Sequence, residues 1–222
     1  MPKKAQSYVF ETLVALFITT LIVSNIASVK IIHAGPFTFD AGTLLFPLAY
    51  IVSDIITEIY GFRRMRRLLY IGISMLLLMS VTFWVVQVLP AASDWSNQGA
   101  FDTILGVIWR IVFASIVALF IGDFMNSYVL AKLKIKTEGR QLWARVVGST
   151  AIGSLIDTVI FSLIAFAGTM SGSTMLQLIA TVYFIKIATE IIVSPLTLAV
   201  INRIKRTENI DTYEDPSLSF TK

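Results

Sequence analysis

The sequence predicts an all-α integral membrane protein, a bundle of six transmembrane helices with both termini in the cytoplasm. The chain has 222 residues, of which 56% are hydrophobic and only 14% are charged, whereas soluble domains carry about 25% charged residues. Six apolar stretches each come close to the ~20 residues that cross about 30 Å of hydrocarbon. Lysines and arginines gather in alternate loops between these stretches, which is typical of multi-pass membrane proteins.

The expected spans form one transporter-sized domain, residues 1–206, with no room for a second soluble domain. Their approximate limits are 8–29, 38–60, 68–89, 106–130, 146–167 and 174–201. The first span follows Lys3 and Lys4 and superficially resembles a signal peptide. Its apolar part runs for about 20 residues without a small-x-small cleavage site, so we expect a retained first helix.

The basic residues predict the orientation of the bundle. They precede span one, follow spans two and six, and fill the loop between spans four and five: Lys3, Lys4, Arg63, Arg64, Arg66, Arg67, Lys132, Lys134, Lys136, Arg140, Arg145, Arg203, Lys205 and Arg206. The opposite loops hold only Lys30, at a boundary. The positive-inside rule then places both termini in the cytoplasm. The pI near 9.4 therefore reflects topology and does not indicate a nucleic-acid partner.

Two segments between and after the spans are expected to be irregular. Residues 90–105 contain Pro90 and Asp94, which argue against a continuous helix in this outer loop. Residues 207–222 form a polar tail that we expect to be disordered, because it has too few apolar side chains to bury.

Ionisable residues inside the expected spans are the strongest functional signal in the chain. Seven of them carry the argument: Asp54, Glu58, Arg110, Asp123, Asp157, Lys186 and Glu190. Each charge near a bilayer centre costs roughly 2.5–3.5 kcal/mol, so seven facing lipid would cost on the order of 20 kcal/mol. Such groups must pair with one another, be hydrated, or bind a polar solute. Intramembrane ionisable groups are functional sites by default, and the pattern favours a solute transporter.

Helical projection gathers these charges on polar stripes, because an α-helix advances about 100° per residue. On span two, a stripe about 100° wide holds Asp40, Thr43, Pro47, Tyr50, Asp54, Thr57 and Glu58. On span six, a stripe about 80° wide holds Tyr183, Lys186, Glu190, Ser194 and Thr197. Span three has no charge and is expected to face lipid.

Depth divides the charges further. Asp157, Lys186 and Glu190 share the middle of the membrane, while Asp54, Glu58 and Asp123 lie toward the cytoplasm. Arg110 lies about one turn inside the outer surface, so it could simply snorkel.

Two pairings of Lys186 are open from the sequence. Lys186 and Glu190 are four residues apart and can pair on one helix face, which would only lower the insertion cost. Alternatively, Asp157 neutralises Lys186 across the bundle, or accepts hydrogen bonds from a solute. The small residues near these charges, such as Gly153 and Gly122, are better explained as helix packing.

Enzyme chemistry is disfavoured because the residues it needs are missing. His33 is the single histidine, so neither a serine–histidine pair within the membrane nor an H-E-x-x-H zinc motif can be built. The chain has no cysteine and no glycine-rich phosphate loop. We expect no cofactor and no metal. A non-transporting scaffold is also disfavoured, because it would not need seven intramembrane charges.

Several segments resemble one known family, the queuosine precursor transporters, also called the vitamin uptake transporter family. The segments are SNIASVK (Ser24–Lys30), DIITEIYG (Asp54–Gly61) with the following arginine cluster, WRIVFASIVALFIGDFMN (Trp109–Asn126), GSLIDTVIFSLIAF (Gly153–Phe166) and YFIKIATEIIVSPL (Tyr183–Leu196). The resemblance covers essentially all six expected spans. Its specificity comes from the order and spacing of the segments together.

The resemblance implies a six-helix importer, in the bacterial inner membrane, for 7-deazaguanine queuosine precursors such as 7-cyano-7-deazaguanine. It would supply tRNA modification without binding tRNA. Its matching segments carry over as substrate-binding positions Asn25, Asp54, Glu58, Arg110, Asp157, Lys186 and Glu190. Tyr183 is a further candidate, to stack on the ring, as are Phe161 and Tyr50.

The partners expected are therefore a small nucleobase-like molecule and the lipid bilayer, and a homo-oligomer is compatible with the sequence. The alternative is a substrate-binding membrane subunit, or an importer of another vitamin- or nucleobase-like solute, driven by a separate energising module. The sequence contains no ATP-binding motif that would decide between them.

Overall fold

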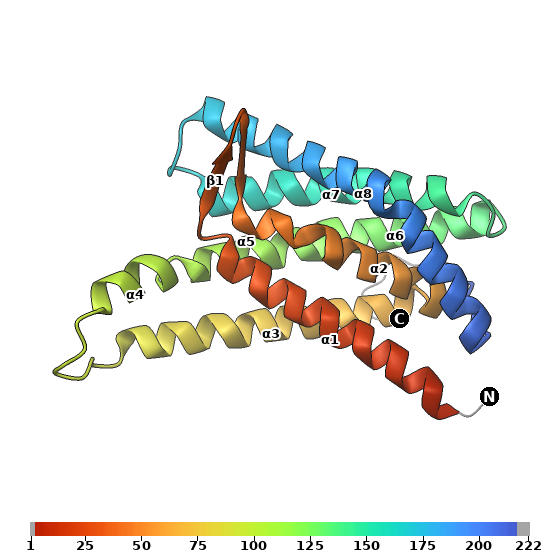
Figure 1. The fold of residues 1–222 in the computed structure, drawn as a ribbon, viewed down its shortest axis with the longest axis horizontal. Helices are drawn as coiled ribbons and strands as arrows, with labels where there is room; N and C mark the ends of the chain where they lie inside the picture. Colours follow the sequence, from red (N-terminus) through yellow and green to blue (C-terminus); the bar gives the residue numbers. More distant parts are fainter. Residues whose placement is uncertain (1–2, 217–222) are drawn as a thin grey trace.

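The protein is a bundle of long helices that run roughly along one axis, with a short β-hairpin at one end (Figure 1). The structure, a computed structural model, describes residues 3–216. In chain order the elements are α1 (Lys3–Ala27), β1 (Ile31–Ala34), β2 (Phe37–Asp40), the 3₁₀-helix η1 (Ala41–Leu44), α2 (Phe46–Tyr60), α3 (Phe62–Val88), α4 (Gln98–Leu105), α5 (Ile108–Ala118), the π-helix η2 (Leu119–Asp123), α6 (Phe124–Lys136), α7 (Leu142–Phe166) and α8 (Gly172–Glu208).

Five helical segments of the described chain are long and apolar enough to cross a membrane. They are Tyr8–Ala27, Phe62–Val88, Gln98–Lys136, Leu142–Phe166 and Gly172–Glu208. The predicted all-helical membrane architecture is thus supported by five spans. The sixth expected helix corresponds to α2, which has 15 residues. That is about 22 Å at 1.5 Å per residue, too short to cross the hydrocarbon alone.

The region expected as a helix from residue 38 begins instead with a β-hairpin. β1 and β2 pair antiparallel, with Ile31 opposite Asp40 and Ala34 opposite Phe37. Gly35 makes the turn with φ +60°, a conformation that glycine adopts without strain. α2 starts only at Phe46 because Pro47 lacks an N–H group and is favoured in the first turn of a helix. The apolar run from 38 to 45 therefore belongs to a strand and a 3₁₀ turn.

A π-helical turn interrupts the long helix formed by α5 and α6. Residues Leu119–Asp123 form this turn, η2, between two α-helical parts. A π-turn inserts one extra residue, so every side chain after it is rotated by roughly 100° relative to an uninterrupted α-helix. Gly122 and Asp123 lie within η2, so the π-turn sets the direction of the Asp123 carboxyl group.

Two glycines let α7 pack very closely against η2 and α6. A Cβ atom on Gly153 would lie 2.5 Å from Cβ of Asn126, and one on Gly122 would lie 2.5 Å from Cβ of Asp157. Real Cβ contacts are never this short, so both positions require glycine. The close approach brings Asp157 on α7 against η2.

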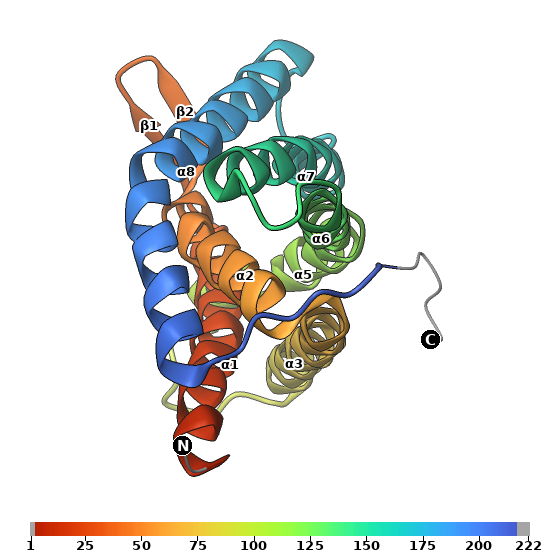
Figure 2. The same ribbon diagram turned by 90° about the vertical axis from the view of Figure 1, so that its right-hand side faces the viewer.

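α3 lies at the periphery, as the sequence predicted. It exposes a series of large apolar side chains, among them Ile71, Leu78 and Trp84. α8 changes direction along its length (Figure 2). It contains Pro195, which cannot donate a backbone hydrogen bond inside the helix and is a common cause of such bends.

The segment after α8 crosses the arginine-rich end of the bundle, close to the ends of α2 and α3 (Figure 2). Thr212 N–H donates to the Ile59 carbonyl at 3.2 Å. Arg63 N–H donates to Glu214 Oε2 at 3.0 Å. Residues 209–216, here called the C-terminal strap, are therefore held on the bundle where the sequence led us to expect disorder. The remainder of the expected tail, 217–222, lies outside the described residues.

The close packing at Gly153 gives a matched pair of substitutions on α7. Gly153→Ala should lower the midpoint of thermal unfolding in detergent, by an amount equivalent to about 1–3 kcal/mol, because the methyl group collides with α6. Gly148→Ala meets nothing within 4 Å and should be neutral or slightly stabilising, since alanine favours helix over glycine. Equal midpoints for the two variants would contradict the packing described here.

Candidate functional site

A buried ion pair joins α7 to α8 in the middle of the bundle. Lys186 Nζ donates to Asp157 Oδ2, and the two side chains are only 4% and 5% exposed. Lys186 Nζ also lies 4.0 Å from the centroid of the Phe46 ring and 5.7 Å from that of Tyr50, both on α2. Of the two pairings that the sequence left open, the structure shows the one across the bundle.

Asp157 lines a small cavity at the centre of the molecule, together with Asp123 from η2. Residues of α1 and α2, among them Phe46 and Tyr50, complete its wall. The cavity holds about 10 Å³, room for about one water molecule. Small-molecule sites usually measure about 300–1,000 Å³. The structure is therefore closed around this point, and a ligand would enter only when the helices separate.

A second group of buried polar side chains lies between α2, α6 and α7. Asp54 Oδ1 accepts a hydrogen bond from Asn126 Nδ2 at 2.8 Å, and Oδ2 accepts one from Thr150 Oγ1 at 3.4 Å. Asp123 Oδ1 accepts from Ser53 Oγ at 3.0 Å. None of the ion pairs found among residues 3–216 involves Asp54 or Asp123. The hydrogen bonds of these carboxyl groups come from neutral donors.

Several buried polar atoms in this part of the described chain have no hydrogen-bond partner. They are Asn25 Oδ1, Asp123 Oδ2, Asn126 Oδ1, Ser154 Oγ, Thr158 Oγ1 and Glu190 Oε1. Leaving a buried polar group unpaired costs about 1–3 kcal/mol, so such a concentration needs an explanation. The atoms belong to helices that surround the central ion pair, where a polar ligand could bond to them.

Glu58 lies in a different network, at the arginine-rich end of the bundle. Arg145 donates to both of its oxygens, at 2.7 and 3.3 Å, and Lys205 Nζ lies 2.7 Å from Oε1. Lys134 Nζ lies 3.4 Å from Oε1 of the same carboxylate. Asp211 of the C-terminal strap lies 2.5 Å from Lys134 Nζ and 2.9 Å from Lys205 Nζ. These five residues, here called the Glu58 network, close that end of the bundle.

The other sequence candidates are distributed around the bundle. Arg110 donates to the carbonyls of Ile164 and Ala167, at 2.9 and 2.5 Å, so it caps the end of α7. Tyr183 donates to the Ala151 carbonyl at 3.3 Å. Asn25 donates to the Leu21 carbonyl of its own helix at 2.8 Å. The structure thus gives backbone partners to these three, and Asn25 Oδ1 is in addition a buried atom without a hydrogen-bond partner.

Glu190 is buried, and no ion pair joins it to Lys186 in the described structure. Its carboxyl group is near enough to that of Asp54 for the two like charges to repel each other. The candidates that the structure gathers are therefore Asp157 with Lys186, and Asp54 with Glu190.

Asp123 belongs with the first of these pairs, although the sequence analysis named it only as a charge and not as a site residue. Helical projection assumes a uniform 100° per residue, and the π-turn at Leu119–Asp123 breaks that assumption. Phe46 was also missed, because this residue falls in the expected interior of a span and carries no polar group. For Asp123, the local sign of a close helix contact was Gly122, the residue before it in the sequence.

Long apolar helices around buried charges indicate a multi-pass membrane transporter. The chain belongs to the family described as putative vitamin uptake transporter, whose model matches residues 40–200.

Three curated proteins are similar in sequence to this chain. A probable queuosine precursor transporter of Bacillus subtilis (strain 168) is 32% identical over 180 residues, which cover 79% of this chain and 77% of the relative. A probable queuosine precursor transporter of Haemophilus influenzae is 28% identical over 60% of this chain and 55% of its own length. The queuosine precursor transporter of Escherichia coli (strain K12) is 28% identical over 56% and 54%. No solved structure matches the chain significantly.

The central ion pair predicts strong coupling between two substitutions. Lys186→Met leaves Asp157 buried without a cation and should cost about 3–5 kcal/mol of stability. Adding Asp157→Asn removes the unpaired charge, so the double variant should be more stable than Lys186→Met alone. The midpoint of thermal unfolding in detergent measures both. A double variant as unstable as the sum of the two single variants would show that the pair is not coupled.

The C-terminal strap should be held by charge, in a pH-dependent way. Burial alone would raise the pKa of Asp211, but hydrogen bonds from Lys134 and Lys205 outweigh it and hold that pKa below its ordinary value. A lowered folded pKa contributes stability above the unfolded pKa of about 3.9, and the contribution is lost as pH falls through the folded pKa. The strap should therefore be anchored at pH 7 and loosen below about pH 4.

Hydrogen exchange of residues 209–216 tests this anchoring at pH 7. Asp211→Asn should speed the exchange of this segment, including the Thr212 amide that is bonded to Ile59. Asp215→Asn is the matched control, because Asp215 and its partner Lys132 are 75% and 55% exposed, and such pairs contribute little. Equal exchange in the two variants would contradict the anchoring role of Asp211.

Proposed function

We propose that this protein imports 7-deazaguanine queuosine precursors, such as 7-cyano-7-deazaguanine, across the inner membrane. The observation that carries the proposal is the central ion pair of Asp157 and Lys186 beside Asp123, buried in a chain of this transporter family. The names of its three relatives support the substrate class. The lysine and arginine distribution supports an orientation with both termini in the cytoplasm.

The chemistry of these side chains suits a deazaguanine. Its Watson–Crick edge presents adjacent N–H donors, and one carboxylate can accept two of them in charge-assisted bonds. Asp157 and Asp123 are the carboxyl groups at the cavity, and Asp123 Oδ2 has no partner in the described structure. Lys186 can donate to the carbonyl of the base once Asp157 turns to the N–H groups.

Two aromatic rings offer a stacking surface for the planar base. Phe46 and Tyr50 both line the cavity, and both lie near Lys186. Aromatic rings at this position can stack on a planar heterocycle when the cavity widens. Analogues without the N–H donors would leave buried carboxyl oxygens unpaired and be rejected.

Alternating access follows from the closed geometry. The Glu58 network ties α2, α6, α7 and α8 to the C-terminal strap at the proposed cytoplasmic end. Release of the substrate to the cytoplasm would require this network to open. We accordingly assign Glu58 to gating and not to substrate contact.

Uptake in cells that cannot make the precursor tests the proposal, with queuosine in tRNA as the readout. The intact protein should restore queuosine when 7-cyano-7-deazaguanine is supplied. Asp157→Asn and Asp123→Asn should each reduce uptake about tenfold or more, the effect of losing a charge-assisted hydrogen bond. Glu138→Gln, a change at a side chain that is 81% exposed, is the control and should leave uptake unchanged.

The two failures are distinguishable. No queuosine with the intact protein, despite good expression in the membrane, would overturn the function. Normal uptake by Asp157→Asn would overturn the site and leave the function standing.

A further inference from the structure

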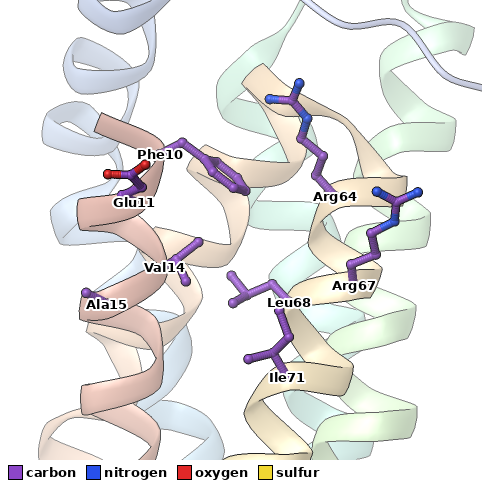
Figure 3. A pocket seen from close by; sticks show the side chains of 8 residues that line it. All are labelled: Phe10, Glu11, Val14, Ala15, Arg64, Arg67, Leu68 and Ile71. Atoms are coloured by element: carbon purple, nitrogen blue, oxygen red, sulfur yellow. The ribbon is translucent and has the colours of Figure 1, made fainter. Parts of the chain in front are cut away.

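A groove of about 430 Å³ lies between α1 and α3, on the outside of the bundle and away from the central cavity. Figure 3 shows its two ends. Arg64 and Arg67 lie at one end, and the apolar side chains of Val14, Leu68 and Ile71 line the other. The groove thus has a charged end and an apolar end along the direction of the helices.

The arginines at the charged end are available for an anion. Arg64 lies over the rings of Phe10 and Tyr60, with its guanidinium carbon 5.5 Å from each centroid. Tyr60 in turn donates to Glu208 at 2.7 Å, which fixes the ring under Arg64. Among residues 3–216, none of the ion pairs found involves Arg64 or Arg67. Both side chains are exposed.

Glu11 also borders the groove. In Figure 3 its carboxylate points away from both guanidinium groups, on the outer side of α1. The charges beside the groove are therefore positive: Arg64 is held over the two rings, and Arg67, one helical turn along α3, is exposed, with its guanidinium directed away from α1 in Figure 3 and free to turn toward a bound anion.

The charged end of the groove lies at the expected membrane surface, and its apolar end lies deeper in the membrane. The candidate spans of α1 and α3 begin at Tyr8 and Phe62. Arg64 and Arg67 therefore lie near the membrane–water boundary, and Ile71 lies one turn deeper, in the hydrocarbon. A phospholipid has the same arrangement, with its phosphate at the boundary and its acyl chain below it. A soluble phosphate compound would leave the apolar wall uncovered.

We propose that this groove is a binding site for an anionic phospholipid. Arg64 and Arg67 hold the phosphate, as arginines do through paired N–H donors. One acyl chain lies along Val14, Leu68 and Ile71 between the two helices. Basic pockets between membrane helices recognise anionic lipid head groups in this way. The bound lipid fills the space between α1 and α3 and adds contacts that neither helix makes alone.

Lipid retention by the purified, full-length protein tests this site. The protein in detergent is titrated with phosphatidylglycerol or with phosphatidylcholine, and native mass spectrometry counts the bound lipid. Phosphatidylglycerol should be retained preferentially. Arg64→Gln combined with Arg67→Gln should weaken its binding roughly thirtyfold, which is about 2 kcal/mol, or about 1 kcal/mol for each arginine.

Two further variants make the test specific. Arg63→Gln removes the same charge from the same helix at a position outside the groove lining, and should leave retention unchanged. Val14→Phe, at a side chain that points from α1 toward α3 in Figure 3, fills the groove while keeping both arginines, and should also reduce retention. Each variant is compared only where its unfolding midpoint without lipid equals that of the unmodified protein.

Three results would overturn the proposal. They are equal retention of the two lipids, unchanged phosphatidylglycerol binding in the Arg64/Arg67 double variant, or complete displacement of the lipid by excess inorganic phosphate. Uptake of the precursor is not measured in this experiment, so its outcome does not depend on the proposed transport function.

Discussion

The ion pair between Asp157 and Lys186 constrains the arrangement of the bundle around it. Each ion loses its hydration on burial, at an effective cost of several kcal/mol, and only a close partner with good geometry offsets that cost. The partner is on another helix, so α7 and α8 must be held in fixed register. Gly122 and Gly153 allow the close approach of α7 to η2 and α6. The π-turn then brings Asp123 to the same cavity as Asp157.

The molecule has two polar networks, one at its centre and one at its closed, arginine-rich end. The centre holds carboxyl groups with neutral donors or a single cation, and several buried oxygens without partners. The Glu58 network, in contrast, surrounds one carboxylate with Arg145, Lys134 and Lys205, and the strap adds Asp211. The three cations around Glu58 hold the helices together at the closed end. The unpaired acceptors at the centre, in contrast, suit a ligand with N–H donors. A buried carboxylate therefore serves different purposes at Glu58 and at Asp157.

The sequence predicted the membrane class, because hydropathy depends on local composition, and it offered the contact between Asp157 and Lys186 as one of two possible pairings. It did not predict the partner of Lys186, since Glu190 and Asp157 were both within reach before the helices were placed. The direction of Asp123 was missed because helical projection cannot anticipate a π-turn. The strap was expected to be disordered because of its polar composition, and three of its anchors, Ile59, Arg63 and Lys134, come from distant parts of the chain. The hairpin at residues 31–40 was hidden by an apolar composition that fits a strand and a membrane helix equally.

Transport as proposed requires that a deazaguanine displace Lys186 from its contact with Asp157. Solid-state NMR of the Lys186 ammonium group in lipid bilayers addresses it directly, with ¹⁵N-lysine labelling and a Lys186→Arg variant to assign the signal. Saturating 7-cyano-7-deazaguanine should shift this resonance, while adenine, which lacks the adjacent N–H donors, should not. An unchanged Lys186 resonance in a sample that demonstrably binds the precursor would contradict this requirement.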